Sequence, residues 1–412
     1  MTSLLLPNHD GGTRLYKVQP ATSWARPTSP LTSRRAYAAA HVIPEMTADN
    51  TPGAPAHLDW DTTMAYRHEL WSYGLGVADA MDTAQRGMGL DWAATQQLIK
   101  RTGVEAASVV ASGNTATAGK TVRDLVSCGA GTDQLDMDSV PEGPAGIKAV
   151  LDAYREQIAV VSEAGPKVII MASRALAKVA ASQEDYLHVY STLLSEVDQP
   201  VILHWLGTMF DPALAGYWGS DDVAEATETF LGLIRDHADK VDGVKVSLLD
   251  ASHEVALRSA LPEGVRLYTG DDFNYPELID GDGAHHSDAL LGIFAAIYPA
   301  ASVALQKYDA GDAADARAIL DSTRELGKHI FSAPTFYYKT GIAFMSWLNG
   351  KQPGFQMVGG LHSGRSVIHL ARTFELADQA GLLRDPALAA FRMSDYLRIN
   401  GVGARATFRG FP

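Results

Sequence analysis

Lys245 is the residue whose setting points most directly to chemistry. It lies in the short apolar run 243–248. If that run is a β-strand, Val244 and Val246 share one face and Lys245 points to the other. An amine on a buried face loses hydration, so its pKa falls and the neutral form becomes a nucleophile toward carbonyl compounds. The alternative is a structural lysine that is ion-paired or reaches solvent from the strand end.

Two further apolar runs end in groups that transfer protons or bind hydroxyls. His204 closes the run 201–205, where an imidazole can act as general acid or base. Asp272 follows the run 265–269, and because it adjoins Asp271 at most one of the two carboxylates is expected to face a common site. A buried hydrogen-bonded histidine and a helix-capping aspartate are the structural alternatives.

The loops after two other runs carry candidate substrate-binding side chains. Ser173 and Arg174 follow the run 168–172, and Asp82 and Arg86 follow the run 77–81. A guanidinium in such a loop can bind a carboxylate or phosphate through two hydrogen bonds. The alternative for each arginine is a solvated surface position.

A metal site is the second chemical hypothesis. Asp82, His204 and Asp272 are conceivable ligands, whereas the adjacent His285 and His286 are poorly placed to bind one ion together. No His-Glu-x-x-His or Cys/His spacing supports a metal site. We therefore predict neither a metal nor another cofactor.

These residues fall into a regular alternation of strands and helices. Strands are expected at 37–43, 77–81, 107–111, 168–172, 201–205, 243–248, 265–269 and 289–295. Helical periodicity lies between most of them, which favours parallel strands with helical crossovers. Eight strands over about 250 residues fit a closed (β/α)₈ barrel, whose catalytic residues lie at the carboxyl ends of the strands. An open, doubly wound sheet is less favoured because no glycine-rich dinucleotide motif follows the first strand.

Three regions are predicted. Residues 1–35 form an appendage of two short strands, at 3–7 and 13–18, and a Pro/Thr/Ser-rich linker. Residues 36–300 form the barrel. Residues 301–412 form a helical C-terminal region, with helices at 311–331, 337–348, 364–381 and 385–397.

Composition limits the possible partners. The 412 residues include 34 Lys plus Arg and 48 Asp plus Glu, for a net charge of −14, which disfavours nucleic acid and anionic membranes as partners. The single Cys128 cannot form an intrachain disulfide, and no apolar run is long enough to span a bilayer. A cytoplasmic protein is expected, and the regions outside the barrel predict a homo-oligomer, either a dimer or a tetramer.

The sequence resembles the dihydrodipicolinate synthase / N-acetylneuraminate lyase superfamily of class I aldolases, close to its dihydrodipicolinate synthase-like branch. Residues 241–245 are similar to the sixth-strand motif of that family, and residues 269–272 are similar to its seventh-strand Ser/Asn-Gly-Asp-Asp. Residues 41–44, the glycine-rich turn at 280–284 and the stretch 333–339 also match in order and spacing. The resemblance implies a (β/α)₈ fold and a Schiff base on Lys245.

Two motifs depart from the family. Its second-strand Gly-Thr-Thr-Gly-Glu, which holds a pyruvate carboxylate, corresponds to the very different residues 81–87. No tyrosine stands near Ser173, where the family has a proton-relaying one, and an insertion is expected at 120–143. The resemblance therefore implies the Schiff-base lysine more strongly than it implies a substrate.

The leading hypothesis is a lyase of the aldolase type that acts through Lys245 on a small, polar keto compound, plausibly one derived from a sugar. His204 would transfer protons, while Arg174, Arg86, Ser173, Asp82 and Asp272 would bind the substrate. The alternatives are a metal-dependent hydrolase, isomerase or lyase on the same barrel, and a barrel that binds a ligand without catalysis.

Overall fold

A closed barrel of eight parallel strands forms the centre of the computed structural model, which describes residues 2–8, 10 and 12–402. Its strands are β3 (Ala36–Ala39), β4 (Gly76–Asp79), β5 (Val126–Ala130), β6 (Lys167–Ile170), β7 (Val201–Leu206), β8 (Val241–Ser247), β9 (Arg266–Thr269) and β10 (Asp288–Leu291). The strands follow one another around the barrel in chain order, and β10 pairs with β3 to close it. The predicted (β/α)₈ fold is confirmed.

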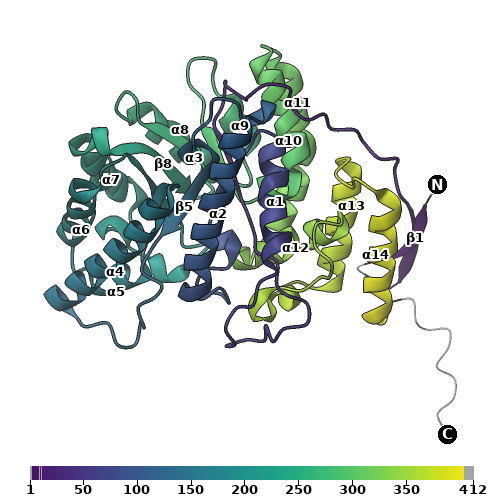
Figure 1. Ribbon diagram of the computed structural model, residues 1–412, viewed down its shortest axis with the longest axis horizontal. Coiled ribbons are helices and arrows are strands. Elements are labelled where there is room, and N and C mark those ends of the chain that lie inside the picture. The colour runs from purple at the N-terminus through teal and green to yellow at the C-terminus, as the bar shows by residue number, and fades with distance from the viewer. Residues whose placement is uncertain (1, 9, 11, 403–412) are drawn as a thin grey trace, which may run out of the picture.

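Helices cover the outside of the barrel (Figure 1). They are α1 (Trp60–Ser72), α2 (Trp92–Ser112), α3 (Val122–Leu125), α4 (Gly143–Ala164), α5 (Arg174–Val179), α6 (Gln183–Glu196), α7 (Val223–Asp236), α8 (Ala251–Ala260), α9 (Tyr275–Asp280) and α10 (Phe294–Asp309). The expected domain boundary at residue 300 falls inside α10, which packs on β3 and β10 as the last crossover helix.

The third strand lies elsewhere than predicted. Residues 107–111 belong to α2, where Ala106 and Val109 continue the helical series of buried positions and Val104 is exposed. The strand is β5, an entirely buried run that holds Cys128. The expected insertion at 120–143 is therefore wrong, because this segment supplies a barrel strand and the loop that follows it.

Two separate apolar cores result from the strand alternation. One lies between the strands and the surrounding helices, and the other fills the barrel interior. The interior core includes Tyr37, Ile202, Tyr268 and Leu290. At the amino end of the strands, Asp242 accepts hydrogen bonds from Lys167 Nζ and from the Tyr268 hydroxyl, both at 2.7 Å. The interior is thus packed near this end, and the cavities that contain Lys245 and His204 lie at the other end.

The C-terminal region is helical, as predicted, and its helices pack beside the barrel (Figure 1). They are α11 (Ala313–Ile330), α12 (Tyr338–Leu348), α13 (Val367–Gln379) and α14 (Pro386–Ile399). The hairpin of β1 (Ser3–Pro7) and β2 (Thr13–Lys17) lies against α13 and α14, so the two ends of the described chain meet (Figure 1). Tyr16 donates to Asp378 at 2.8 Å, and the Trp24 indole donates to the carbonyl of Gly381 at 2.8 Å.

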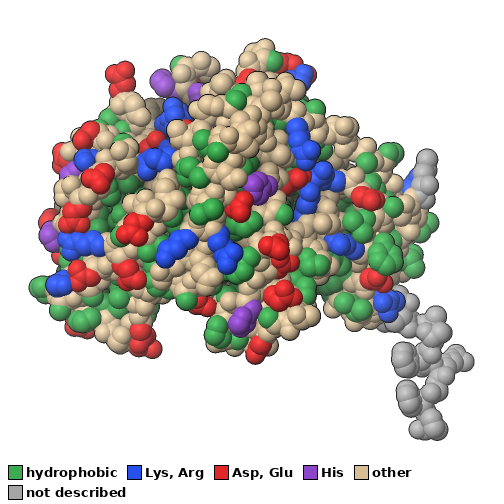
Figure 2. All heavy atoms as spheres, viewed as in Figure 1, with side chains coloured by type: hydrophobic (Ala, Val, Ile, Leu, Met, Phe, Trp, Pro, Cys, Tyr) green, Lys and Arg blue, Asp and Glu red, His purple; other side chains and the backbone are tan. Residues whose placement is uncertain are grey.

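The surface carries charges of both signs. Acidic and basic side chains are interspersed with apolar ones over the face shown in Figure 2. Among the described residues, no helix combines the length and apolar character needed to cross a bilayer.

A buried ion pair joins α1 to the end of β4. Arg67 and Asp79 are fully buried, and the guanidinium donates to both carboxylate oxygens, at 3.1 and 2.8 Å. Arg67 also donates to the carbonyl of His41 at 2.7 Å, and Thr102 donates to Asp79 at 2.7 Å. This pair therefore fixes where the chain leaves β4 on its way to Asp82.

We predict that Arg67→Leu destabilises the fold by about 3 to 5 kcal/mol, because it leaves the Asp79 carboxylate buried without its partner. Urea unfolding followed by circular dichroism measures the change. Lys148→Leu, which removes the exposed i,i+4 pair with Asp152, is the matched control and should change stability little. A loss no larger than that of the control would contradict the assigned role.

Candidate active site

Lys245 points into the barrel near the carboxyl end of β8. In the strand register it lies between His204 of β7 and Tyr268 of β9, and it is 8% exposed. Its amine makes no hydrogen bond or ion pair with any residue that the structure describes. Burial lowers the pKa of this amine, while the carboxylates of Asp82 and Asp272 raise it in part.

Two adjoining compartments lie at this end of the barrel. The inner one, of about 10 Å³, surrounds Lys245, and the outer one, of about 240 Å³, adjoins His204. Asp82 and Leu206 line both compartments and so form their common boundary. The rest of the inner compartment is lined by Met81, Thr83, Phe210, Ser247, Asp272, Gly292, Phe331 and Tyr338.

The turn after β9 places Asp272 in the same compartment as Lys245. Its carboxylate accepts a hydrogen bond from the backbone N–H of Ile293 at 2.7 Å, and burial raises its pKa. Asp271 instead accepts from the backbone N–H groups of Phe273 and Asn274, both at 2.9 Å, so Asp272 is the one that lines the compartment. Gly270 is required here, because a Cβ at this position would lie 2.2 Å from Ser247 Oγ and 3.0 Å from Lys245 Cε.

His204 is a buried neutral base that lines the outer compartment. Its Nε2 lies 3.3 Å from Ser247 Oγ, and its Nδ1 has no partner among the described residues. Burial lowers the pKa of the imidazole well below its usual value, and the charge of Lys245 lowers it further. Such an imidazole is available to accept a proton.

Ser173 and Arg174 lie at the start of α5, on the wall of the outer compartment. The Ser173 hydroxyl caps this helix by accepting from the Leu176 N–H at 2.9 Å, and it lies 2.6 Å from the Thr132 hydroxyl. The Arg174 side chain is 43% exposed and forms an ion pair with Asp211.

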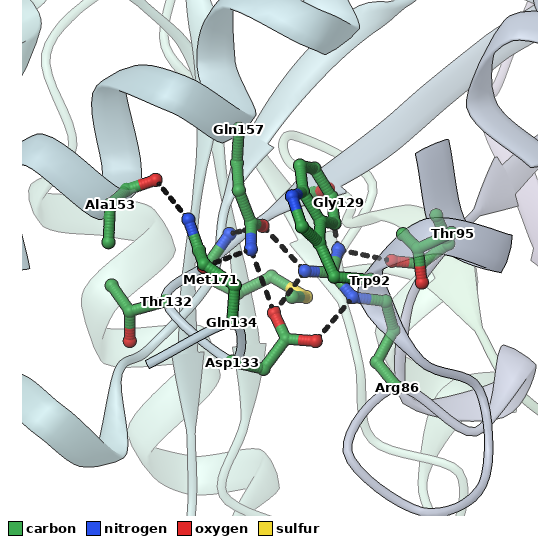
Figure 3. Close-up of polar contacts among 12 residues, drawn as sticks. Arg86, Trp92, Thr95, Gly129, Thr132, Asp133, Gln134, Ala153, Gln157 and Met171 are labelled. Atoms are coloured by element: carbon green, nitrogen blue, oxygen red, sulfur yellow. Dashed lines mark hydrogen bonds and ion pairs between the residues drawn. The ribbon is translucent and has the colours of Figure 1, made fainter. Parts of the chain in front are cut away.

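Arg86 is bound to protein groups on all sides (Figure 3). Its guanidinium pairs with Asp133 and donates to the carbonyls of Ala80 and Gly129, at 3.1 and 2.9 Å, and to Gln157. These bonds occupy the donors that substrate binding would need. Arg86 therefore joins the loop after β4 to the loop after β5, and so orders Asp82 and Asp133 on the cavity wall.

The C-terminal region supplies side chains that the sequence did not identify as site residues. The Tyr338 hydroxyl lies 2.7 Å from that of Thr83, and its ring stacks on Phe331 at 4.3 Å between centroids. The next residue, Lys339, is buried, donates to the carbonyl of Phe336 at 3.1 Å and lies over the Phe336 and Tyr338 rings. Burial lowers the pKa of Lys339 to about 8.

All seven predicted site residues thus lie at the carboxyl end of the barrel strands. Lys245 and Asp272 line the inner compartment, Asp82 lines both, and His204, Arg174, Ser173 and Arg86 line the outer one. His286, by contrast, precedes β10, at the opposite end of the strands. Within the described ranges, no three His, Cys, Asp or Glu side chains gather closely enough to hold a metal ion.

One family model matches nearly the whole sequence. A model described as "Protein of unknown function (DUF993)" matches residues 4–402. The chain belongs to the DUF993 family. A search of curated proteins finds no match.

The DUF993 chain resembles solved structures of dihydrodipicolinate synthases in fold. One, from Aquifex aeolicus, is 13% identical and gives a TM-score of 0.59, with 85% of this chain and 99% of that chain covered. A prophage protein of the dihydrodipicolinic acid synthase family from E. coli K12, in complex with pyruvate, is 14% identical with the same TM-score and the same coverage. The chloride-inhibited enzyme from Acinetobacter baumannii, complexed with pyruvate, is 15% identical, also at 0.59, with 85% and 100% covered. The fold that the sequence resemblance implies is thereby confirmed.

A buried glutamate supports the turn that carries Asp272. Glu254 of α8 accepts from the hydroxyls of Thr269 at 2.9 Å and Ser287 at 2.8 Å. Burial raises its pKa to about 8, although these two hydroxyls lower it. The folded state therefore binds a proton here that the unfolded state releases at lower pH, so this group contributes stability that is lost as the pH rises through about 8.

We predict that wild-type stability falls, relative to that of Glu254→Gln, by about 1 kcal/mol per pH unit between about pH 5 and 8. The neutral amide keeps the hydrogen bonds without a proton to lose. Urea unfolding of both proteins across this range measures the difference. Glu263→Gln, which removes an exposed carboxylate, should follow the wild-type curve. Parallel curves for wild type and Glu254→Gln would contradict the raised pKa.

Proposed function

We propose that the protein is a lyase of the aldolase type that forms a Schiff base between Lys245 and a small, polar keto compound, plausibly one derived from a sugar. The observation that carries the proposal is the Lys245 amine, which is buried in the barrel with no hydrogen-bonding partner among the described residues. Burial favours the neutral amine, which is the nucleophilic form.

The reaction begins with attack of the amine on the carbonyl carbon. A nitrogen–carbon bond forms, the carbonyl oxygen leaves as water, and the resulting iminium draws electrons from a neighbouring bond as that bond breaks. Asp272 is suited to protonate the departing oxygen, because burial raises its pKa and keeps a proton on it. His204 is suited to take the proton from the substrate hydroxyl and to return it to carbon.

The structural neighbours support a keto compound as the ligand, since two of them are complexes with pyruvate. The metal-dependent alternative has less support, because Asp82, His204 and Asp272 do not form a ligand cluster among the described residues. A barrel that binds without catalysis gives no reason for an amine buried without a partner.

The proposed homo-oligomer stays a prediction. The apolar side chains that the structure leaves exposed include Leu5 and Leu15 on the hairpin and Phe391 and Ile399 on α14. The hairpin contacts α14, so both elements with exposed apolar side chains lie in one part of the fold, where a second copy can bury them.

Borohydride trapping tests the Schiff base directly. Incubation with a panel of 2-keto acids and ketoses, followed by reduction and peptide mass analysis, should place an adduct on Lys245. Lys245→Ala and Lys245→Arg should give no adduct at this position and no turnover, because a guanidinium stays protonated and cannot form the imine. Lys167 is the internal control, since it is buried but paired with Asp242. An adduct on Lys339 alone, or none at all, would overturn the proposal.

A separate variant tests proton transfer. His204→Gln should still form the trapped adduct but should lower turnover of the best-trapped compound about 10²- to 10⁴-fold, because it removes the base and leaves the amine in place. Turnover and adduct yield are measured on the same preparation. Unchanged turnover in His204→Gln would assign proton transfer to another group.

A further inference from the structure

Carboxyl groups line the inner compartment around Lys245. The atoms attached to the substrate's carbonyl carbon must lie in this compartment when that carbon is bonded to Lys245. Asp82 and Asp272 both line it, and both carboxyl groups are close enough to Lys245 to raise the pKa of its amine in part. Of the described residues that line this compartment, Lys245 alone has a cationic side chain. A carbonyl carbon bonded to Lys245 therefore places its substituents beside carboxyl oxygens.

The other cationic side chains near the site are bonded to protein groups. Arg86 is bound to Asp133, Gln157 and two backbone carbonyls. Arg174 pairs with Asp211 in the outer compartment. Lys339 lines neither compartment, but it donates to the carbonyl of Phe336, packs on the Tyr338 ring, and is close enough to Asp82 for that carboxylate to raise the pKa of its amine. None of the three lines the inner compartment, where the group attached to the carbonyl carbon would lie.

The remaining lining of the inner compartment is apolar or already bonded. Phe210, Phe331 and Tyr338 form aromatic walls, and the hydroxyls of Thr83 and Tyr338 are bonded to each other. A carboxylate buried here would lie beside the Asp82 carboxylate in a poorly hydrated space, which is unfavourable. A hydroxyl, by contrast, donates a strong hydrogen bond to a carboxylate.

We propose that the substrate carries a hydroxyl-bearing carbon next to its carbonyl, as hydroxyketones and ketoses do, and that Asp82 determines this specificity by binding the hydroxyl and excluding 2-keto acids. The inference rests on the proposed Schiff-base function and narrows its substrate class. The proposed specificity applies to the group attached directly to the carbonyl carbon. It does not apply to the part of the substrate that extends into the outer compartment.

Hydroxyacetone and pyruvate form a matched pair of probes. They differ in whether a hydroxymethyl group or a carboxylate adjoins the keto carbon. Each would condense with the Lys245 amine with loss of water, and hydride from borohydride would then reduce the carbon–nitrogen double bond to a stable secondary amine. The two adducts differ in mass, so both probes can be offered together and counted on the same peptide.

In the wild-type protein, the hydroxyacetone adduct on Lys245 should exceed the pyruvate adduct about tenfold or more, a factor that corresponds to a modest electrostatic discrimination. Asp82→Asn, which keeps the shape and removes the charge, should lower this ratio about tenfold. Asp239→Asn is the matched control, because it removes an exposed carboxylate just before β8, at the opposite end of the strands, and should leave the ratio unchanged. Circular dichroism checks that each variant is folded.

The outcomes separate the two proposals. A pyruvate adduct that equals or exceeds the hydroxyacetone adduct in the wild type would overturn the substrate assignment while leaving the Schiff base intact. A ratio that Asp82→Asn does not change would remove Asp82 as the determinant. No adduct with either probe, or with the wider panel, would overturn the Schiff-base function and the inference that rests on it.

Discussion

The Lys245 amine is buried without a bonded counter-charge, and the arrangement of side chains at the carboxyl end of the barrel strands depends on this constraint. The protein contains a clear internal contrast. Lys167, at the amino end of its strand, is bonded to Asp242 at 2.7 Å, whereas Lys245, near the carboxyl end of its strand, has no bonded partner among the described residues. The first is an ordinary solution to burying a lysine. The second favours a neutral amine and explains why carboxyl groups, apolar walls and a glycine surround it.

The C-terminal region is part of this arrangement and not an independent unit. Tyr338 reaches the hydroxyl of Thr83, and the carbonyl of Val358 accepts from Gln85 at 2.9 Å. Both contacts hold the loop after β4, which carries Asp82, while Arg86 joins the same loop to the loop after β5. The helices beyond the barrel therefore close the inner compartment, and removing them would open the space around Lys245 to water.

The strand alternation and the positions of site residues after strands were predictable from the sequence, because both follow from local periodicity and from barrel geometry. The third strand was assigned to the wrong segment, because the adjacent valines near the end of α2 resemble a short apolar strand more than the run that holds Cys128 does. The helical spacing of Ala106 and Val109 was the signal that could have placed these valines in a helix. The roles of Arg86 and Tyr338 depend on partners 47 and 255 residues away in the chain. No local pattern reports such contacts.

The proton distribution between Lys245 and Asp272 connects the fold to the proposed chemistry. Burial lowers the pKa of the amine and raises that of the carboxyl, so the resting site favours a free amine beside a protonated acid. In the proposed reaction, that proton leaves with the carbonyl oxygen as water, and the positive iminium then lies beside the new Asp272 carboxylate. The reaction thus creates the iminium and the Asp272 carboxylate together, as a close pair of opposite charges. The space around them is too small for bulk water to solvate either charge. A second anion on the substrate would disturb this balance, so the proposed preference for a hydroxyl follows from the same physical constraint as the buried amine.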